Sequence, residues 1–340
     1  MGKNIKRKTN VKSSIMVLLL IAILLIASTY AWFTSNRTVT ISSIDVNVAT
    51  SSGIQISVDG INWKTVISNT DITGASATYN AAVNAIPASM LPVSTVGAVS
   101  GDRMAMFYGI VQANETTGVY ELHTADSAEA DASSGKYIVF DVFLKVDEDK
   151  TVYLTDASDV TALETDKGLK NAARVAFCIL GHGGLNSTTS DIQGLTGGTD
   201  VYIWEPNYDV HTQAGVNAAS SIYGRTTTLA NGSKLPYYGV KAVIDEDDPV
   251  LLNNQSEDYF AEITDTIGTK AGRLAKIAES TEGNPKTMGT QELMDLDAGI
   301  TKVRIYMWIE GQDVDCENTA SGSDIRFDVG FTIDPVEPIL

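Results

Sequence analysis

The stretch Ile-Arg-Phe-Asp-Val-Gly-Phe-Thr-Ile at residues 325–333 alternates between apolar residues and polar or small ones. Successive side chains of a β-strand point to opposite faces, so this pattern predicts a strand with one buried face. The buried face would carry Ile325, Phe327, Val329, Phe331 and Ile333. A slip of one residue would bury the charged residues of the other face, so the register of this strand is well specified.

The same period of two predicts further strands at residues 39–48, 54–58, 138–146, 173–179, 201–204 and 303–309. The alternation within 39–48 changes phase at Ser42-Ser43, which predicts a β-bulge. Asp59-Gly60 lies between two alternating runs and predicts a hairpin turn. Residues 151–155 follow an acidic turn and are expected to pair with 138–146.

Helical patterns are few, and only 274–278 and 292–296 are expected to form short helices. Segments rich in Ser, Thr, Ala, Gly and Asn separate the strands at 66–101 and 183–234. The chain is therefore predicted to be all-β: a jelly-roll-like sandwich of two antiparallel sheets, with long loop insertions within about 183–300. A hydrophobic N-terminal signal helix would precede this domain, which spans residues 32–340.

The first 31 residues have the layout of a secretory signal peptide. Five basic residues precede an uncharged apolar run at 15–27, and small residues follow it. We expect signal peptidase to cut between Ala31 and Trp32. The alternative is an uncleaved membrane anchor, because the run continued through Phe33 is just long enough to span a bilayer. Either way the domain would lie outside the cell, secreted or at the cell surface, and would meet the membrane only through this segment.

The charge of the mature chain excludes two classes of partner. Residues 1–31 hold five of the 24 basic residues and none of the 42 acidic ones. The mature chain therefore has 19 basic and 42 acidic residues, which gives a net charge of −23. Nucleic acids and anionic membrane surfaces both require a basic face. Such a charge suits a self-repelling soluble surface or one that binds cations.

No catalytic motif is present in the sequence. The three histidines, His123, His182 and His211, do not form HExxH, and there is no GxSxG, Walker loop or GxGxxG. We therefore expect no enzymatic activity and no cofactor. Acidic residues at 245–248 and 313–324 offer the oxygen ligands that Ca²⁺ prefers, but without EF-hand spacing, and solvated acidic turns are the simpler interpretation.

The chain has two cysteines, Cys178 and Cys316. An exported pair can form a disulfide, and one closing so long a loop would stabilise the fold by roughly 4–5 kcal/mol. Two buried thiols are the alternative, and the sequence leaves both open.

Two stretches resemble known proteins. Residues 27–36, Ala-Ser-Thr-Tyr-Ala-Trp-Phe-Thr-Ser-Asn, leading into 39–48, resemble the start of the TasA/CalY (camelysin) family of Gram-positive matrix proteins. Residues 303–316 with 325–333 are similar to the terminal strands of uncharacterised surface proteins that have the same kind of leader. The first resemblance implies cleavage by a SipW-type signal peptidase, a jelly-roll fold and assembly into extracellular fibres of a biofilm matrix.

In such fibres the N-terminal segment of one subunit completes the sheet of the next. The resemblance places this donor strand at Trp32, Phe33, Val39, Ile41, Ile44, Val46 and Val48. The partner would be a second copy of the chain, joined head to tail. An ordinary first strand of a monomer is equally compatible with the pattern. The alternative function is a cell-surface adhesin or glycan-binding sandwich, in which an exposed Trp63, Trp204 or Trp308 stacks on sugar.

Overall fold

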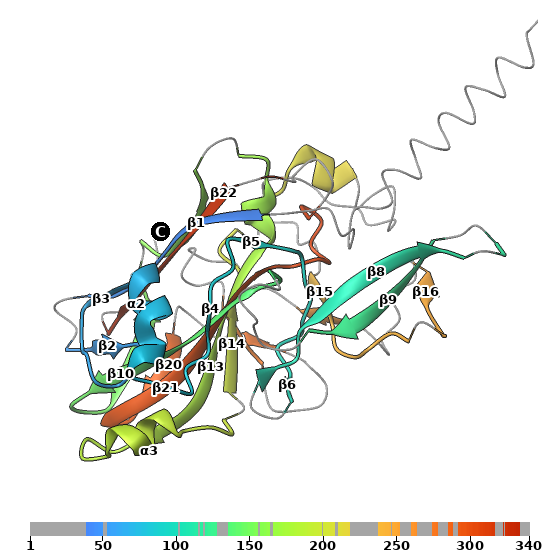
Figure 1. Cartoon of the computed structure of the whole chain (residues 1–340). Coiled ribbons are helices and arrows are strands. Elements are labelled where there is room, and N and C mark those ends of the chain that lie inside the picture. The colour runs from blue at the N-terminus through green and yellow to red at the C-terminus, as the bar shows by residue number, and fades with distance from the viewer. Residues whose placement is uncertain are drawn as a thin grey trace, which may run out of the picture.

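A computed structural model of the chain describes residues 39–49, 53–100, 103–114, 116–117, 120–127, 135–155, 157–163, 166–198, 200–207, 210–217, 237–245, 247–251, 260–263, 274–277, 285–287, 292–316, 322 and 324–333. Strands predominate and form several sheets (Figure 1). This confirms the all-β prediction.

Sheet A has the strand order β20-β11-β22-β1-β3, with β12 also pairing with β22 and β5 with β1. Its strands are β1 (Val39–Val48), β3 (Val66–Ser68), β5 (Ser89–Met90), β11 (Lys150–Leu154), β12 (Asp159–Ala162), β20 (Glu292–Leu296) and β22 (Asp324–Thr332). The predicted C-terminal strand is therefore β22, and it lies at the centre of the sheet. The predicted bulge is confirmed, because the register of β1 against β22 shifts between Ile41 and Ser43.

Sheet B has the order β19-β18-β14-β13-β21-β10-β2, with β4 also pairing with β10. Its strands are β2 (Gln55–Ser57), β4 (Asn84–Ala85), β10 (Ile138–Val146), β13 (Ala173–Gly183), β14 (Asp200–Trp204), β18 (Leu274–Ile277), β19 (Pro285–Thr287) and β21 (Gly299–Ile309). The strands that alternation predicted at 138–146, 173–179, 201–204 and 303–309 all belong to this sheet.

Three small sheets and several short helices complete the described structure. The small sheets pair β6 (Val99–Ser100) with β7 (Arg103–Met104), β15 (Tyr237–Val240) with β17 (Phe260–Ile263), and β9 (Tyr120–Asp126) with β8 (Phe107–Ala113) and β16 (Val250–Leu251). The helices include α2 (Asn69–Gly74), η1 (Ala75–Ala77), η2 (Leu169–Ala172) and α3 (Thr189–Gln193), and residues 213–217 are also helical. The β8–β9 hairpin extends away from the two large sheets (Figure 1).

One apolar core lies between sheets A and B. Phe327 and Phe331 of β22 are fully buried in it together with Phe140 of β10 and Ile305 of β21. The rings of Phe177 and Phe331 meet edge to face across the two sheets, with centroids 5.7 Å apart. These are the residues that the period-two pattern placed on inward faces.

The other face of sheet B is also buried, although alternation predicted strands with one buried face. Val139, Tyr306 and Trp308 form a second apolar cluster there with Met104 and Met106. The segment that the sequence showed as a loop at 66–101 supplies β4 and further cover, since Val93 bonds to Ile309 and Gly311. Because this face is covered, its charged residues are buried and form ion pairs with one another.

Asp141 and Arg304 illustrate this second layer. Arg304 Nε donates to Asp141 Oδ1 at 2.6 Å, and Lys302 Nζ lies 3.6 Å from Asp141 Oδ2. Tyr79 donates to the same carboxylate at 3.0 Å. Alternation alone cannot distinguish an exposed polar face from a covered one whose charges are paired, which explains the error.

Two further expectations about single elements were wrong, and the hairpin expected at Asp59-Gly60 is present with a different turn. Residues 274–277 and 292–296 form strands β18 and β20, not helices, because pairing with β14 and β11 overrides a weak local preference. Strand β11 pairs with β20 and β22 and not with β10, so the acidic turn after Val146 leads from one sheet to the other. The hairpin after β2 is wider than an Asp-Gly turn, since Ile56 pairs with Lys64.

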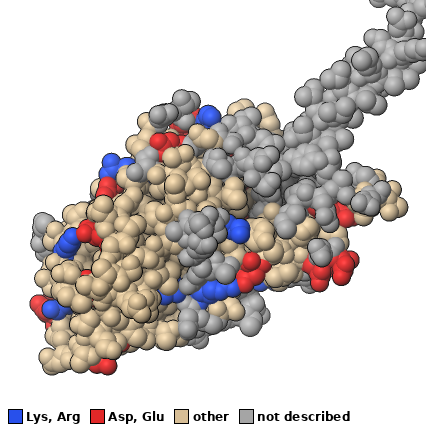
Figure 2. Space-filling model, in the orientation of Figure 1, with Lys and Arg blue, Asp and Glu red and all other residues tan. Residues whose placement is uncertain are grey.

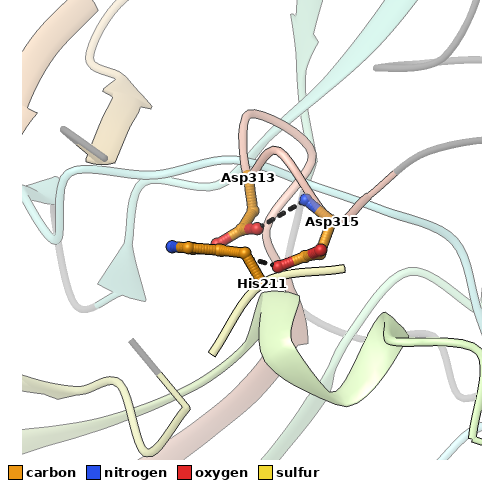
Figure 3. A group of neighbouring side chains, drawn as sticks. All are labelled: His211, Asp313 and Asp315. Carbon is orange, nitrogen blue, oxygen red and sulfur yellow. Dashed lines mark hydrogen bonds and ion pairs between the residues drawn. The ribbon is translucent and has the colours of Figure 1, made fainter. Parts of the chain in front are cut away.

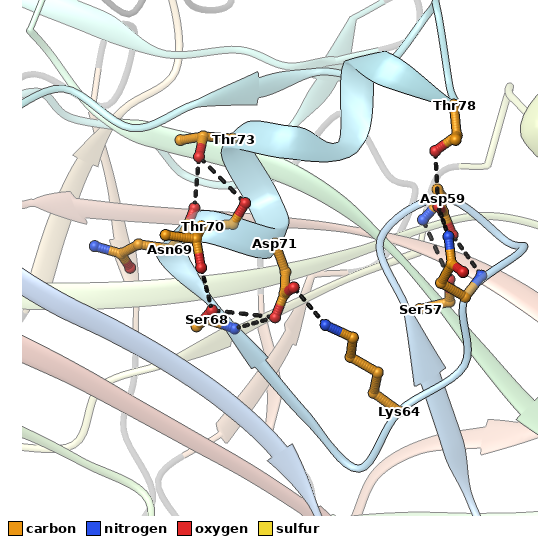
Figure 4. A network of polar contacts seen from close by, with 10 residues as sticks. Ser57, Asp59, Lys64, Ser68, Asn69, Thr70, Asp71, Thr73 and Thr78 are labelled. Atoms are coloured by element: carbon orange, nitrogen blue, oxygen red, sulfur yellow. Dashed lines mark hydrogen bonds and ion pairs between the residues drawn. The ribbon is translucent and has the colours of Figure 1, made fainter.

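Asp59 organises this wide turn (Figure 4). Its buried carboxylate accepts hydrogen bonds from the backbone N–H groups of Ile61 and Asn62, at 2.9 and 2.8 Å, and from the side chains of Ser57, Asn62 and Thr78. Burial by itself would raise the pKa of Asp59, but the hydrogen bonds from Asn62, Thr78 and Ile61 hold it well below its ordinary value.

Replacing Asp59 by alanine should lower the free energy of unfolding by roughly 2–3 kcal/mol, because several buried donors lose their acceptor. The depressed pKa means that this stabilisation is present above the ordinary value of 3.8 and is lost as the pH falls below it. Urea denaturation at pH 7 measures the loss. The matched control is Asp71→Ala, whose side chain is partly exposed, and it should cost about 1 kcal/mol or less. Equal losses would contradict this assignment.

Candidate functional sites

Strand β1 is the first candidate site, because it is an internal strand formed by the N-terminal end of the described chain. It pairs in parallel with β22 on one side, and antiparallel with β3 and β5 on the other. The other pairings of sheet A are antiparallel. Val39, Ile44, Val46 and Val48 are buried in the core between the sheets, and Ile41 packs against it. Trp32, Phe33 and the expected cleavage position after Ala31 lie outside the described residues.

Two polar contacts fix the register of β1. The N–H of Ile44, next to the bulge, donates to Asn69 Oδ1 of α2 at 2.9 Å. On the partly exposed face, Arg326 of β22 binds Asp45 of β1 at 2.9 Å and Asp328 at 2.7 Å. Asp45 and Asp328 are register partners, so the guanidinium bridges two carboxylates that would otherwise repel.

The second candidate site is a buried group of charged residues, here called the His211 cluster: Arg174 of β13, Glu205 just after β14, His211, and Asp313 and Asp315 of the turn after β21. Figure 3 shows His211, Asp313 and Asp315. Arg174 and Asp315 are completely buried, and the His211 side chain is 10% exposed. The guanidinium of Arg174 forms ion pairs with both Glu205 and Asp313.

Asp315 joins this turn to the segment 210–217. Its Oδ2 lies 2.7 Å from His211 Nδ1, and its Oδ1 accepts from the N–H and the hydroxyl of Thr212, both at 2.8 Å. Asp313 Oδ1 in turn accepts from the N–H of Asp315 at 2.8 Å. Gly215 is required beside this carboxylate, because a Cβ there would lie 2.6 Å from Asp315 Oδ1.

The cluster changes the titration of two of its members. Burial by itself would lower the pKa of His211, but the hydrogen bond to Asp315 and the charges of Asp313, Asp315 and Glu205 raise it above its ordinary 6.5. Burial also raises the pKa of Asp315, and the neighbouring charge of Asp313 acts in the same direction. Both shifts reflect an excess of carboxylates in a site from which water is largely excluded.

The ligand atoms of His211, Asp313 and Asp315 lie within 4.8 Å of one another, which invites comparison with a metal site. The donor set fits Ca²⁺ poorly, since Ca²⁺ takes six to eight oxygen ligands. Here the carboxylate oxygens are already engaged by Arg174, Thr212, His211 and the Asp315 N–H. We therefore assign these groups to an ion-pair network. In the other acidic segment, Asp245 accepts from the N–H of Asp247 at 3.0 Å, as in an ordinary acidic turn.

The two cysteines do not form a disulfide. Both are buried, but Cys178 belongs to the apolar cluster on the outer face of sheet B, whereas Cys316 belongs to the core between the sheets. Sheet B therefore separates them, and of the two alternatives left open by the sequence the structure has the buried thiols.

Two of the three tryptophans considered for sugar stacking are unavailable. Trp204 and Trp308 are fully buried, and Trp308 donates to Glu310 at 3.1 Å. Trp63 is partly exposed, and Lys145 lies 5.7 Å from its ring centroid. A cleft of about 350 Å³ lies between the turn at Asp59 and helix α2, but its Asp59 and Asp71 carboxylates are bonded to neighbouring residues.

Sequence reasoning missed Arg174, Glu205 and His211 as members of one site. One signal was present: Arg174 is a lone charge within the otherwise apolar run 172–180. Such a residue must be paired if the strand is buried on both faces. The identity of its partners could not be read from the sequence, because Glu205 and Asp313 come from distant segments.

The fold and these sites define an all-β protein with a buried ion-pair network and with an internal strand at the N-terminal end of the described residues. Comparison of the chain with family models, with curated proteins and with solved structures finds no match. Within the described residues the helices are short, and none has the length and apolar character needed to cross a membrane.

Proposed function

We propose that this protein is a secreted structural subunit of an extracellular surface or biofilm-matrix fibre, and that copies assemble by exchange of strand β1. The proposal includes a jelly-roll-like sandwich as the subunit fold and removal of residues 1–31 by a signal peptidase. The observation that carries it is the position of β1: an internal, mostly buried strand located at one end of the described domain.

The place of β1 in the chain makes exchange physically simple. No described strand precedes β1, so β1 can leave its position without displacing an earlier strand of the described chain. Leaving it empty would expose the edge of β22 and the apolar core, so the vacant position strongly favours a replacement strand. An identical β1 from a second copy matches the bulge, Asn69 and Arg326 as well as the original does.

The connection after β1 limits the geometry of the fibre. Only residues 49–54 join β1 to β2, and six extended residues span at most roughly 20 Å. Donor and acceptor subunits must therefore touch. Repeated head-to-tail contact that does not close on itself gives a filament.

Surface charge is compatible with close packing of copies. A net charge of −23 makes mature chains repel one another, but the repulsion is not uniform over the surface. The segment 72–100, which includes β4, β5 and β6, contains no Asp, Glu, Lys or Arg. In Figure 2 the charged side chains of the described residues lie mainly around the margin of the visible face, and a broad central area is uncharged.

A crosslinking experiment tests whether β1 pairs within its own chain or with a neighbour. The double substitution Asp45→Cys/Asp328→Cys places thiols at register partners on one face of sheet A. After oxidation of concentrated 32–340, strand exchange predicts a ladder of disulfide-linked oligomers on a non-reducing gel. Filaments in negative-stain electron microscopy should appear in the same samples.

The single substitution Asp45→Cys is the control, and it should yield at most linked dimers. A crosslinked monomer at every concentration, without filaments, would overturn the proposal and favour a monomeric surface module. That alternative function, an adhesin or glycan-binding sandwich, would then depend on Trp63, because Trp204 and Trp308 are buried. A synthetic peptide of residues 32–48 should shorten the filaments if exchange occurs, since it occupies the acceptor position without donating a further strand.

A further inference from the structure

The segment 210–217 is bound to the turn 310–316 through the ionisable side chains of His211 and Asp315. His211 and Thr212 both bind Asp315, and within the segment the N–H groups of Gly215 and Val216 donate to Thr212. No role in strand exchange requires these contacts, because they lie outside β1 and its pairing partners. They nevertheless include a pair between His211 and the completely buried Asp315.

The charges around His211 do not balance. Arg174 from β13, Glu205 after β14, and Asp313 and Asp315 from the turn face it. Among these described groups, three carboxylates and one guanidinium give a net charge of −2 when His211 is neutral, and −1 when it is protonated. The negative charges of Asp313, Asp315 and Glu205 favour a positive charge on His211 in this buried site, so the protonated imidazole stabilises the closed arrangement.

The hydrogen bonds of the His211 ring agree with a preference for the protonated imidazole. Nδ1 donates to Asp315, whereas Nε2 is buried and has no hydrogen-bond partner among the described residues. Figure 3 shows Nε2 directed away from both carboxylates. Since Nε2 has no partner among the described residues, the nearby carboxylates decide which protonation state the closed cluster prefers.

We propose that the His211 cluster is a pH-sensitive latch, which fastens the segment 210–217 to the turn 310–316 in mild acid and loosens it in alkali. The contribution of His211 to the closed state is complete below its ordinary pKa of 6.5, and it is lost as the pH rises through the raised pKa of the closed cluster. The raised pKa of Asp315 acts in the same direction, because its ionised form disfavours the closed cluster at higher pH.

Two measurements on the mature chain test the latch. The chain has only three histidines, so the Cε1–H signal of His211 in an NMR pH titration is identified by its loss in His211→Gln. We expect its midpoint above 6.5. Hydrogen exchange of residues 210–217, corrected for the intrinsic rate, should then show protection that falls between pH 6 and pH 9. The fall should be about tenfold for each unit by which the midpoint exceeds 6.5.

The matched control is His182→Gln, whose side chain is exposed on β13 and which should keep the wild-type pH dependence of exchange. His211→Gln should remove that dependence. A His211 midpoint at or below 6.5, or protection of 210–217 that does not change with pH, would overturn the latch. The wild-type titration needs no variant, so the test holds even if His211→Gln folds poorly, and its result is independent of whether β1 is exchanged.

Discussion

Replacing Arg174 by methionine should lower the free energy of unfolding by about 3–5 kcal/mol. Arg174 is completely buried and pairs with Glu205 and Asp313, and its guanidinium also donates to the backbone carbonyls of Asn171 and Ala173 at 3.0 Å. Methionine has a similar length but no charge, so two buried carboxylates would lose their counter-ion. Urea denaturation at pH 7, followed by far-ultraviolet circular dichroism, measures the difference.

The control for this prediction is Arg326→Met. Arg326 also binds two carboxylates, but its side chain is 40% exposed, so water replaces the lost contacts and the cost should be about 1 kcal/mol or less. A triple variant, Arg174→Met/Glu205→Gln/Asp313→Asn, should recover much of the loss, because it removes the uncompensated charges as well. If Arg174→Met costs no more than Arg326→Met, the His211 cluster is not a charged network.

The second large effect is expected in strand β1. Val46→Asp should lower the free energy of unfolding by about 4 kcal/mol or more, and should abolish filament formation. Val46 is fully buried and lies between its register partners Ile67 of β3 and Val329 of β22. A carboxylate there has no partner and disrupts the core whether β1 occupies its own subunit or a neighbour.

Ser43→Asp is the control within the same strand. Its register partner is Arg326, so the new carboxylate meets a positive charge and the stability should change by about 0.5 kcal/mol or less. Urea denaturation and negative-stain electron microscopy of both variants give the two readouts. A Val46→Asp chain as stable as the wild type would show that β1 does not belong to the core.

Local patterns in the sequence predicted most strands of the two large sheets. Alternation identified β1, β10, β13, β14, β21 and β22, and the phase change at Ser42-Ser43 marked the bulge that the structure has in β1. These features depend on which face of a strand is apolar, and that is written in adjacent residues. Alternation did not identify the strands at 274–277 and 292–296, because segments this short do not show whether the apolar residues recur with the period of a strand or of a helix.

Pairing between distant segments was beyond the reach of these patterns. Nothing near Lys150–Leu154 indicates that it pairs with β20 and β22 instead of β10. The sequence also did not predict that the outer face of sheet B is covered. An alternating pattern is the same whether its charged residues are solvated or form buried ion pairs. Asp141 and Arg304, and Arg174 with Glu205 and Asp313, are paired only because the fold brings them together.

The sequence by itself determined the all-β class, the inward faces of the main strands and the strong negative charge of the domain, since each follows from composition or from neighbouring residues. Only the tertiary structure decided that β1 lies inside sheet A beside β22, that Cys178 and Cys316 are on opposite sides of sheet B, and that His211 meets Asp315. Those contacts join residues from about 100 to nearly 300 positions apart. Their formation depends on loop closure and on packing of the whole core, which no local pattern encodes.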